Sequence, residues 1–547
     1  MKFDSFKKTV SALVSGTSFL VVWYFLFKLY LFAKGSINID IHYNLIFLLY
    51  AVLPLPLKIA KHRMLKIASA GFTVFLALSI LWHDSWLPPV IDAGIFLNQQ
   101  GIPSFSYIIS FIGGFFSMSL IIVAISLLLF SMIVRKYKVT TTALLAILIV
   151  VAPIAPLEFG RSQGVSGEPQ VAPAEAAETN PAKRLEAFYS SEAERVIMFR
   201  KPESTNAPFD IVILHVCSLS WDDLKQIEIT QDDPFFKQFD YLFTNFNSVS
   251  GYSGPAVIRL LQANFGQRKH TDYYKKDVPK SSMLFDGLAS VGYDNHVVMS
   301  HDGKYGDYIK SMKTSGLHNA IMLLPENMSP TALFFDSKTP LFSDYAMMKK
   351  WFDARESSKS ERAAVYFNSV LLHAGSHWIG EKNYLNRDKK DQFKEMSTVL
   401  TKDTKKIIEL LKTSKRNTVL VFLPEHGRAL TGSPFQPADL RDIPLPKITR
   451  VPVGIKFIGP KFNNAKSQQT MIAKPTSYFA LAWMLSKFVE NSPFGNSAMS
   501  AEDILLKVPK TDFVAEHEWN RIIEMEGKFF YSGKDRKWKE LTPDQLK

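Results

Sequence analysis

The chain has 547 residues, which leaves room for more than one domain. Its formal net charge is +13, but no base-stacking aromatic motif accompanies the excess of lysine and arginine, so we expect no nucleic-acid partner. Because the chain has a single cysteine, Cys217, an internal disulfide is excluded.

The first third of the chain is rich in long apolar segments. Five of them predict membrane spans, at about 10–33, 43–60, 64–82, 107–134 and 140–158. The first follows three lysines, as in a signal peptide, but its apolar stretch is too long and no clear cleavage site follows, so we expect it to be retained.

Basic residues fix the expected orientation of these spans. They gather before the first span and in two loops: Lys2, Lys7 and Lys8, then Lys58, Lys61, Arg63 and Lys66, then Arg135, Lys136 and Lys138. The positive-inside rule places these loops in the cytoplasm, so five crossings put everything after residue 160 outside the cytoplasmic membrane. The remaining positive charge either faces anionic lipid head groups or is ordinary surface charge.

A linker and a helix are expected to follow the membrane domain, which we assign to residues 1–159. Residues 160–183 are rich in glycine, proline, alanine, serine and glutamate, which is typical of a linker. Residues 184–200 predict a helix with Leu185, Phe188 and Tyr189 on one side. This helix packs on the next domain or on the bilayer; the sequence leaves both open. We therefore assign 160–205 to the linker and helix.

From residue 206 to 547 the pattern alternates between strand and helix. Strands are expected at 210–216, 295–299, 364–371, 418–423 and 451–457, with helices at 281–291, at 393–411 and from about Thr476. This alternation predicts an α/β fold with a mostly parallel sheet and helices on both faces. The tail is expected to form a small hairpin over 522–540 that turns near Gly533 and Lys534.

Three potential metal ligands follow two of the expected strands. Cys217 comes directly after the strand 210–216, and Glu425 and His426 come after the strand 418–423, with Gly427 permitting a turn. Open α/β sheets place their chemistry beyond the carboxyl ends of the strands. A thiol there is a core residue, a nucleophile or a ligand. Together with Glu425 and His426 it makes a plausible zinc set, with a fourth position for the oxygen of Ser253.

Ser253 stands just before an apolar helical run that has Pro255 in its first turn. A helix N-terminus holds an anion well, and zinc lowers the pKa of a neighbouring hydroxyl, so Ser253 is a candidate nucleophile for phosphoryl transfer. The alternative is that its hydroxyl only caps the helix.

Two histidines, His373 and His377, follow the strand 364–371. Either could bind phosphate oxygens or protonate a leaving group. We favour His377 because it lies deeper in the loop, and the other histidine is then structural. Tyr252 and Arg441 are candidates for contacting phosphate or substrate, or else serve packing and ion pairing.

The chain resembles a known family through these motifs. The segments are HVCSLSW (215–221), NFNSVSGYSGPA (245–256), PEHGRAL (424–430), LRDIP (440–444) with VPVG (451–454), and WHDSWLP (82–88) in the membrane domain. They are similar to those of the cellulose phosphoethanolamine transferases of bacterial cellulose secretion systems. The resemblance implies an alkaline phosphatase-like, zinc-dependent catalytic domain in the periplasm, held to the inner membrane by a multi-pass anchor. It matches Cys217, Glu425 and His426 to the zinc ligands, Ser253 to the nucleophile and His377 to the histidine near the phosphate.

The resemblance also implies the substrates and partners. Phosphatidylethanolamine of the inner membrane is the expected donor, a glucose hydroxyl of cellulose the expected acceptor, and subunits of the cellulose synthase complex the expected partners. Most transferases of the wider superfamily carry a carboxylate at the position of Cys217 and aspartate at that of Glu425, and the family leads us to expect tyrosine where this chain has Trp378. Alternatives are a transferase for lipid A or another glycan, a phosphodiesterase, and a non-catalytic scaffold subunit; the single cysteine counts against the disulfide-rich lipid A enzymes.

Overall fold

The structure is a computed structural model in which the described residues are 19–33, 37, 39–52, 63–85, 118–134, 137–154, 180–202, 206–275, 278–304, 308–460, 469–495, 499–534 and 536–546. The chain divides into two compact units, one that holds the N-terminal helices and one that holds the chain from residue 180 on.

The first unit contains a helix at each of the five expected spans. They are α2 (Phe19–Ala33), α3 (Ile41–Val52), α5 (Arg63–Asp84), α8 (Met118–Val134) and α9 (Lys138–Ile154). Among the described residues only the segment Ile67–Asp84 is both long and apolar enough to cross a membrane, and the other four helices have shorter apolar stretches. The number of crossings therefore stays a prediction. Much of what bears on it lies outside the described residues: Lys2, Lys7, Lys8, Lys58, Lys61, Arg135, Lys136 and the linker residues 160–179.

A buried polar network joins three helices of the first unit. The Lys28 ammonium on α2 donates to Asn44 Oδ1 on α3 at 2.6 Å and lies 2.8 Å from Asp84 Oδ2 at the end of α5. Asn44 Nδ2 also donates to Asp84 Oδ2. Because a buried ion is costly unless it is fully paired, this network fixes how the three helices pack. Asp84 belongs to the WHDSWLP motif, so this member of the motif has a structural role.

The second unit is built on an eight-stranded sheet in the order β11-β2-β10-β9-β1-β7-β3-β4. Its strands are β1 (Phe209–Val216), β2 (Tyr241–Asn247), β3 (Asp294–Met299), β4 (Ile321–Leu323), β7 (Ala363–Ser369), β9 (Asn417–Pro424), β10 (Arg450–Ile458) and β11 (Thr470–Ile472). A smaller sheet comprises β5 (Ala332–Leu333), β6 (Pro340–Leu341) and β8 (His377–Trp378). The five predicted strands are present within two residues of the expected bounds, whereas β2, β4 and β11 were not predicted.

The direction of the strands brings four loops to one edge of the sheet. Strand β1 pairs parallel to β7 and β9, while β10 pairs antiparallel to both β9 and β2. Strand β2 consequently runs the same way as β9, so the loops that follow β1, β2, β7 and β9 all leave the same edge. The predicted α/β class with a mostly parallel sheet is confirmed, with β10 as the antiparallel member of a mixed sheet.

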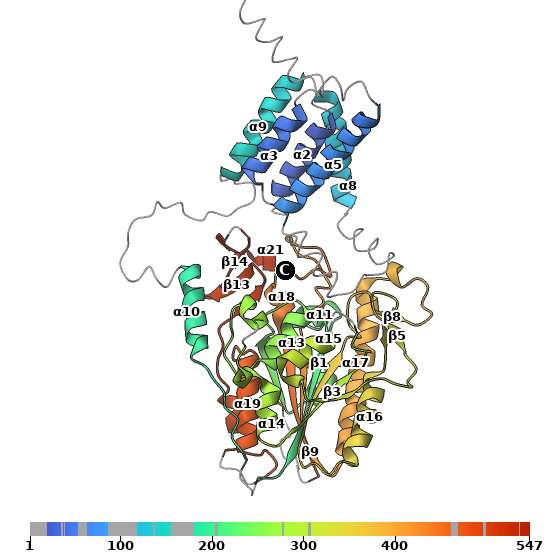
Figure 1. Ribbon diagram of the computed structural model, residues 1–547, viewed down its shortest axis with the longest axis vertical. Helices are drawn as coiled ribbons and strands as arrows, with labels where there is room; N and C mark the ends of the chain where they lie inside the picture. The colour runs from blue at the N-terminus through green and yellow to red at the C-terminus, as the bar shows by residue number, and fades with distance from the viewer. Residues whose placement is uncertain are drawn as a thin grey trace, which may run out of the picture. The chain divides into compact units, whose positions relative to one another are not determined.

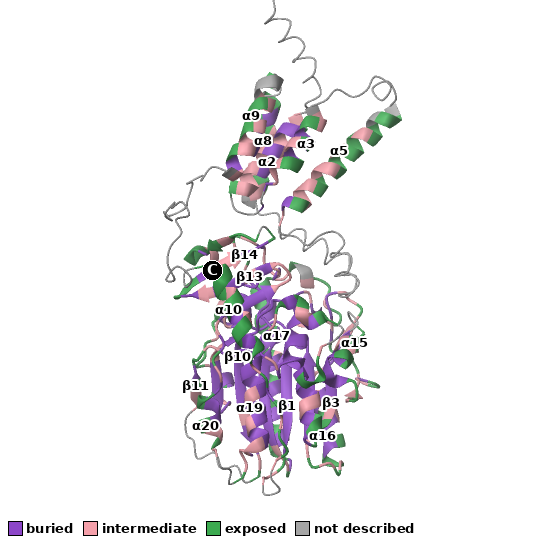
Figure 2. Ribbon diagram, turned by 60° about the vertical axis from the view of Figure 1, so that its left-hand side comes forward, coloured by how far each residue is buried: buried purple, intermediate pink, exposed green. Residues whose placement is uncertain are grey.

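Helices cover both faces of the large sheet (Figure 1), and the strands between them are buried (Figure 2). On one face pack α13 (Ser253–Leu261), α14 (Leu284–Ser290), α19 (Tyr478–Glu490) and α20 (Ala501–Leu506). On the other pack α11 (Trp221–Gln226), α12 (Pro234–Lys237), α16 (Asp344–Glu356) and α17 (Lys389–Lys412). Strand β1 alternates between the two: Ile211 and Ile213 face the first layer, Val212 and Leu214 the second. Three short helices of this unit are α15 (Tyr308–Met312), α18 (Pro446–Thr449) and α21 (Pro543–Leu546).

The C-terminal tail corrects the expected hairpin. It forms a four-stranded antiparallel sheet of β12 (Val514–His517), β13 (Asn520–Met525), β14 (Lys528–Ser532) and β15 (Trp538–Glu540). The turn inside 522–540 that joins β13 to β14 lies at Glu526 and Gly527, which have φ values of 51° and 75°. Positive φ at both central residues is the requirement of a tight type I′ hairpin turn. The predicted turn near Gly533 and Lys534 is also present and joins β14 to β15, so the segment 522–540 has two turns where one was expected.

The helix expected at 184–200 is α10 (Pro181–Ala193), and it packs on the second unit. Phe188 is buried with Val514 and Ile523 of the C-terminal sheet, and the Tyr189 hydroxyl donates to Glu516 Oε2 at 2.7 Å. Of the two placements that the sequence left open, the structure therefore has the helix on the domain.

Candidate metal centre

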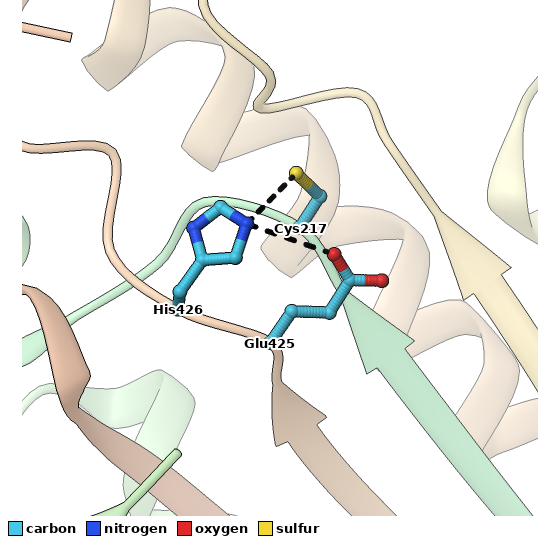
Figure 3. Close-up of side chains that lie close together, drawn as sticks. All are labelled: Cys217, Glu425 and His426. Carbon is cyan, nitrogen blue, oxygen red and sulfur yellow. Dashed lines mark hydrogen bonds and ion pairs between the residues drawn. The ribbon is translucent and has the colours of Figure 1, made fainter. Parts of the chain in front are cut away.

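The side chains of Cys217, Glu425 and His426 converge from two neighbouring loops. One ligand atom from each lies within 4.8 Å of the others, and all three side chains are fully buried. Figure 3 shows His426 facing both partners: its Nε2 is 3.8 Å from Cys217 Sγ and 3.9 Å from Glu425 Oε2. Parallel pairing of β1 with β9 sets Val216 beside Pro424, so the residues that follow them meet at the sheet edge.

Ser253 is the fourth member of this group, and it does not occupy the helix-capping position expected from the sequence. It is the first residue of helix α13, whose N-cap is Tyr252, so its hydroxyl makes no capping bond. Instead Ser253 Oγ lies 3.2 Å from His426 Nε2 and 3.4 Å from Cys217 Sγ. The alternative that Ser253 is only a helix cap is therefore wrong. Unlike the three buried side chains, Ser253 is partly exposed, so it can meet a substrate.

The arrangement fits a tetrahedral zinc ion on the chemistry and spacing of its donors. Zinc bonds of 2.0–2.3 Å place neighbouring ligands roughly 3.3–3.8 Å apart, which agrees with the separations among Ser253, His426 and Cys217. Glu425 Oε2 is buried and has no hydrogen-bond partner among the described residues. A buried carboxylate oxygen without a partner is costly unless an ion or donor meets it.

The pKa values of the three buried groups also favour a bound cation. Burial raises the pKa of the Cys217 thiol to about 12 and that of the Glu425 carboxyl to about 7, and it lowers the pKa of His426 well below its usual range. The protein alone thus disfavours the charged form of each of the three groups. A divalent cation reverses the balance for the thiol and the carboxyl, because metal ligands bind in their deprotonated forms and release protons.

A second layer of polar groups supports Glu425. Asn368, near the end of β7, donates from Nδ2 to Glu425 Oε1 at 2.7 Å, and its Oδ1 lies 2.9 Å from His301 Nε2. Such partners orient metal ligands and raise their affinity. The sequence analysis missed Asn368. The available signal was an amide side chain inside an otherwise apolar strand, close to its carboxyl end.

The two candidate histidines occupy different surroundings. In each, ring Nδ1 lies near a backbone carbonyl, 2.8 Å from Ala374 O for His373 and 3.0 Å from Gly375 O for His377, so Nδ1 carries the proton and Nε2 is an acceptor. His373 packs against Phe334 and Phe335, and burial followed by the Arg441 charge lowers its pKa to about 3. His377 stacks on Tyr384, and no contact among the described residues joins it to the three buried side chains.

Tyr252 and Arg441, the two candidate substrate contacts, lie together beside Ser253. The Arg441 guanidinium is 5.1 Å from the centre of the Tyr252 ring, and the Tyr252 hydroxyl donates to Asp442 Oδ2 at 3.1 Å. The loops are tightly packed here, because a Cβ on Gly251 would lie 2.5 Å from Arg441 O. Gly427 is needed for a similar reason: a Cβ there would come within 2.5 Å of Ser220 Oγ, so space, not a left-handed turn, requires the glycine.

Strained backbone borders the site. Ser218, Val249 and Ala429 have φ values of 67°, 68° and 57°, in the left-handed region. Each follows or precedes one of the converging residues by a few positions. Left-handed backbone is a genuine outlier for the β-branched Val249, and such conformations gather at functional sites.

Comparison with known proteins gives a match over both units. The family model described as the cellulose biosynthesis protein BcsG C-terminal domain matches residues 166–538, and that of the BcsG N-terminal domain matches residues 22–152. The curated BcsG of Escherichia coli (strain K12) is 29% identical over 540 residues, covering 92% of this chain and 93% of that protein. BcsG of Salmonella typhimurium (strain LT2) is 30% identical over 538 residues with the same coverage.

Solved structures give weaker matches. A protein of the alkaline phosphatase superfamily from Vibrio parahaemolyticus has a TM-score of 0.44 at 13% identity, covering 67% of this chain and 92% of that one. The C-terminal periplasmic domain of EptC from Escherichia coli, solved in complex with Zn, has a TM-score of 0.42 at 12% identity, covering 59% and 94%. Likenesses this low carry no argument about activity. The two domain models and the full-length relatives decide the assignment: the chain belongs to the BcsG family of cellulose biosynthesis proteins.

Proposed function

We propose that this protein transfers phosphoethanolamine from phosphatidylethanolamine to glucose hydroxyls of cellulose through a covalent phosphoserine-type intermediate on Ser253. Membership of a cellulose biosynthesis family supports the cellulose context. The observation that carries the proposal is the position of Ser253 Oγ, a partly exposed hydroxyl within 3.4 Å of both Cys217 Sγ and His426 Nε2.

The proposed cofactor is zinc, held by Cys217, Glu425 and His426 with the Ser253 oxygen completing the set. Zinc bound there supplies a Lewis acid that favours the ionised hydroxyl and offsets negative charge on a phosphoryl group. Asn368 keeps the Glu425 carboxylate in place for this purpose. Helix α13 contributes the free backbone N–H groups of its first turn, which favour an anion beside Ser253.

In the first half of the proposed reaction Ser253 Oγ attacks phosphorus, and its proton passes to Nε2 of His377 or His373. The bond from phosphorus to the diacylglycerol oxygen breaks, and the same histidine gives the proton to that oxygen. In the second half a glucose hydroxyl, for which we propose the C6 hydroxyl, loses its proton to this Nε2 and attacks the same phosphorus. The bond to Ser253 Oγ then breaks, and the serine oxygen takes the proton, which regenerates the hydroxyl. Arg441 holds the negatively charged phosphate oxygens throughout, because its buried guanidinium makes no ion pair with a carboxylate of the described residues.

The proposed location is the periplasmic side of the bacterial inner membrane, with the first unit as a multi-pass anchor. Anchoring raises the effective concentration of a lipid donor at the site. The apolar helix segment Ile67–Asp84 supports an anchor. Cellulose synthase subunits are the proposed neighbours in the membrane.

The test is a Ser253→Ala variant of the full chain in cells that make cellulose. We expect phosphoethanolamine on cellulose to fall at least about a thousandfold, because the nucleophile is gone. Ser250→Ala is the matched control: Ser250 is a buried serine of the same loop whose hydroxyl has no hydrogen-bond partner, so modification should continue. Unchanged modification in Ser253→Ala would refute the proposal and leave a scaffold.

A second measurement separates the transferase from its rivals. The purified protein is given phosphatidylethanolamine with glucan chains, with lipid A, or with neither. Phosphoethanolamine appearing on glucan supports the proposal. Product on lipid A, or headgroup released equally well without any acceptor, contradicts it in favour of another transferase or a phosphodiesterase.

A further inference from the structure

Arg441 and Asp442 are adjacent in the chain, lie beside Ser253 and carry opposite charges. Among the described residues neither forms an ion pair with a permanently charged group. Arg441 is buried; within the same described part of the chain its Nε has no hydrogen-bond partner, and its Nη1 donates only to the carbonyl of Arg428 at 3.4 Å. Asp442 has two titratable neighbours within 4 Å among the described residues: Tyr252, whose hydroxyl is 3.1 Å from Oδ2, and His517, whose Nε2 is 3.9 Å from Oδ1. No ion pair within 4 Å joins Arg441 to Asp442, so each charge is available to a ligand.

His517 does not neutralise the Asp442 carboxylate. Burial, followed by the charge of Arg259, lowers the pKa of His517 to about 3, so its ring is neutral at physiological pH. Lys534 and Arg441 act on Asp442 only from beyond ion-pair distance. The Asp442 side chain nevertheless keeps 15% of its surface exposed, and its Oδ1 accepts no hydrogen bond among the described residues. The side chain therefore has exposed surface and an oxygen that can still accept a hydrogen bond from a cationic ligand.

The position of Asp442 relative to Ser253 is fixed by Tyr252. The Tyr252 hydroxyl donates to Asp442 Oδ2 at 3.1 Å, the Arg441 guanidinium lies 5.1 Å from the centre of its ring, and the next residue along the chain is Ser253. On the far side, Asn520 Nδ2 donates to the Asp442 carbonyl at 3.0 Å, which attaches the C-terminal sheet to this loop. The two opposite charges are thus held at a fixed spacing around one residue that neighbours the nucleophile.

This pattern is complementary to a small zwitterion with one anionic and one cationic end. We propose that Asp442 binds the ammonium group of the donor's ethanolamine headgroup while Arg441 faces its phosphate, so that Asp442 selects this headgroup over neutral ones. The inference rests on the proposed function and adds the residue that distinguishes the substrate class. A charge-assisted hydrogen bond from an ammonium to a carboxylate is among the stronger polar contacts, and it gives specificity because a neutral headgroup leaves the carboxylate unpaired.

The experiment compares two soluble diesters that differ in one group. These are 4-nitrophenyl phosphoethanolamine and 4-nitrophenyl propyl phosphate, in which a methyl replaces the ammonium. Release of 4-nitrophenolate by the purified full chain reports attack by Ser253 without any glucan. We expect kcat/KM of the wild type to favour the aminoethyl diester by about 10- to 100-fold. In Asp442→Asn this preference should collapse to within about threefold, because kcat/KM for the aminoethyl diester falls by much more than kcat/KM for the propyl diester.

Matched variants separate recognition from folding. Asp439→Asn removes a buried carboxylate of the same loop that is already paired with Arg428 and Lys389, so it should keep the preference. Asp442→Glu, which keeps the negative charge, should retain most of the preference for the aminoethyl diester. Asp442→Ser replaces Asp442→Asn where the asparagine variant does not fold.

Every outcome of this comparison either supports or overturns the inference about Asp442. A wild type that handles both diesters equally, an Asp442→Asn variant that keeps the full preference, or an equal fall for both diesters would each overturn the inference; the last indicates a structural role. If the wild type releases nitrophenolate from neither diester, or Ser253→Ala releases it as the wild type does, the proposed function itself fails.

Discussion

Cys217 is a thiol without exposed surface that faces two other potential ligands. Its replacement tests the metal centre directly. We expect the purified wild-type chain to keep about one zinc per molecule after dialysis against a weak chelator, and Cys217→Ala to lose most of it, because one of the buried donors is removed. Elemental analysis measures the metal, and circular dichroism confirms that the variant is folded. Equal zinc in both proteins would contradict the assignment of Cys217.

Asn368 gives a prediction about the support of the metal site, because it contacts the proposed ligand Glu425 and would not bind the zinc itself. Asn368→Ala removes the 2.7 Å hydrogen bond to Glu425 Oε1, and we expect zinc affinity to fall by about 10- to 100-fold. Competition with a chromophoric chelator measures the affinity. The control is Asn295→Ala. The side-chain amide of Asn295, on β3, donates to the carbonyl of Phe285 on α14, so this variant should bind zinc as the wild type does. No difference between the two variants would exclude the supporting role.

At this scale the sequence was informative where a chemically distinctive residue directly follows a strand. Cys217, Glu425 and His426 could be predicted to converge for that reason, and the structure brings them together. Asn368 lies inside its strand, and Asp442 lies well beyond the end of β9, so only the folded loops reveal their contacts. The choice between His373 and His377 was also beyond the sequence, because it depends on which ring faces the substrate.

At the scale of elements, strand existence was easier to predict than strand pairing. Runs of β-branched and aromatic residues located β1, β7 and β9, but direction depends on how each loop returns. Because β10 pairs antiparallel with β9, the connection between these two strands begins and ends at the same edge of the sheet. This one connection therefore supplies both Glu425 and Arg441. β2 escaped prediction because Thr244 and Asn245 interrupt its apolar run. The turn at Glu526 was missed because glutamate is an unusual residue at positive φ.

The start of helix α16 offers a prediction about pH. Asp344 is buried there, Ser369 Oγ donates to its Oδ2 at 2.7 Å, and burial raises its pKa from an ordinary 3.8 to about 7. Between these pH values the folded state binds a proton that the unfolded state has released. The contribution to the free energy of unfolding is therefore complete below about pH 4 and is lost as pH rises to about 7.

Asp344→Asn should remove this dependence. Relative to the wild type, we expect the variant to gain roughly 1–4 kcal/mol of stability between pH 4 and pH 8, an upper range set by the size of the pKa change. Thermal unfolding of the full chain at both pH values measures the difference. Asp353→Asn, an exposed residue on the same helix, should show no such trend. A constant difference between variant and wild type across this range would contradict the account.

For the whole molecule, the predicted topology can be tested directly. Five crossings with a cytoplasmic N-terminus would place residue 165 outside the cytoplasm. Reporter enzymes that are active only after export, fused after residue 165, should therefore be active, and fusions after residue 136 should be inactive. Activity at residue 136, or its absence at residue 165, would contradict the five-span arrangement.

The loops that carry the candidate site residues leave one edge of the large sheet, so the opposite edge takes no part in the site. There the partly exposed turns 357–362 and 413–416 lead from α16 and α17 back into β7 and β9. The length of a strand, about 25 Å, separates these turns from the reactive edge. A fluorophore or affinity handle inserted at either turn would allow the protein to be imaged or captured from cells, together with whatever it assembles with, while its working surface stays uncovered.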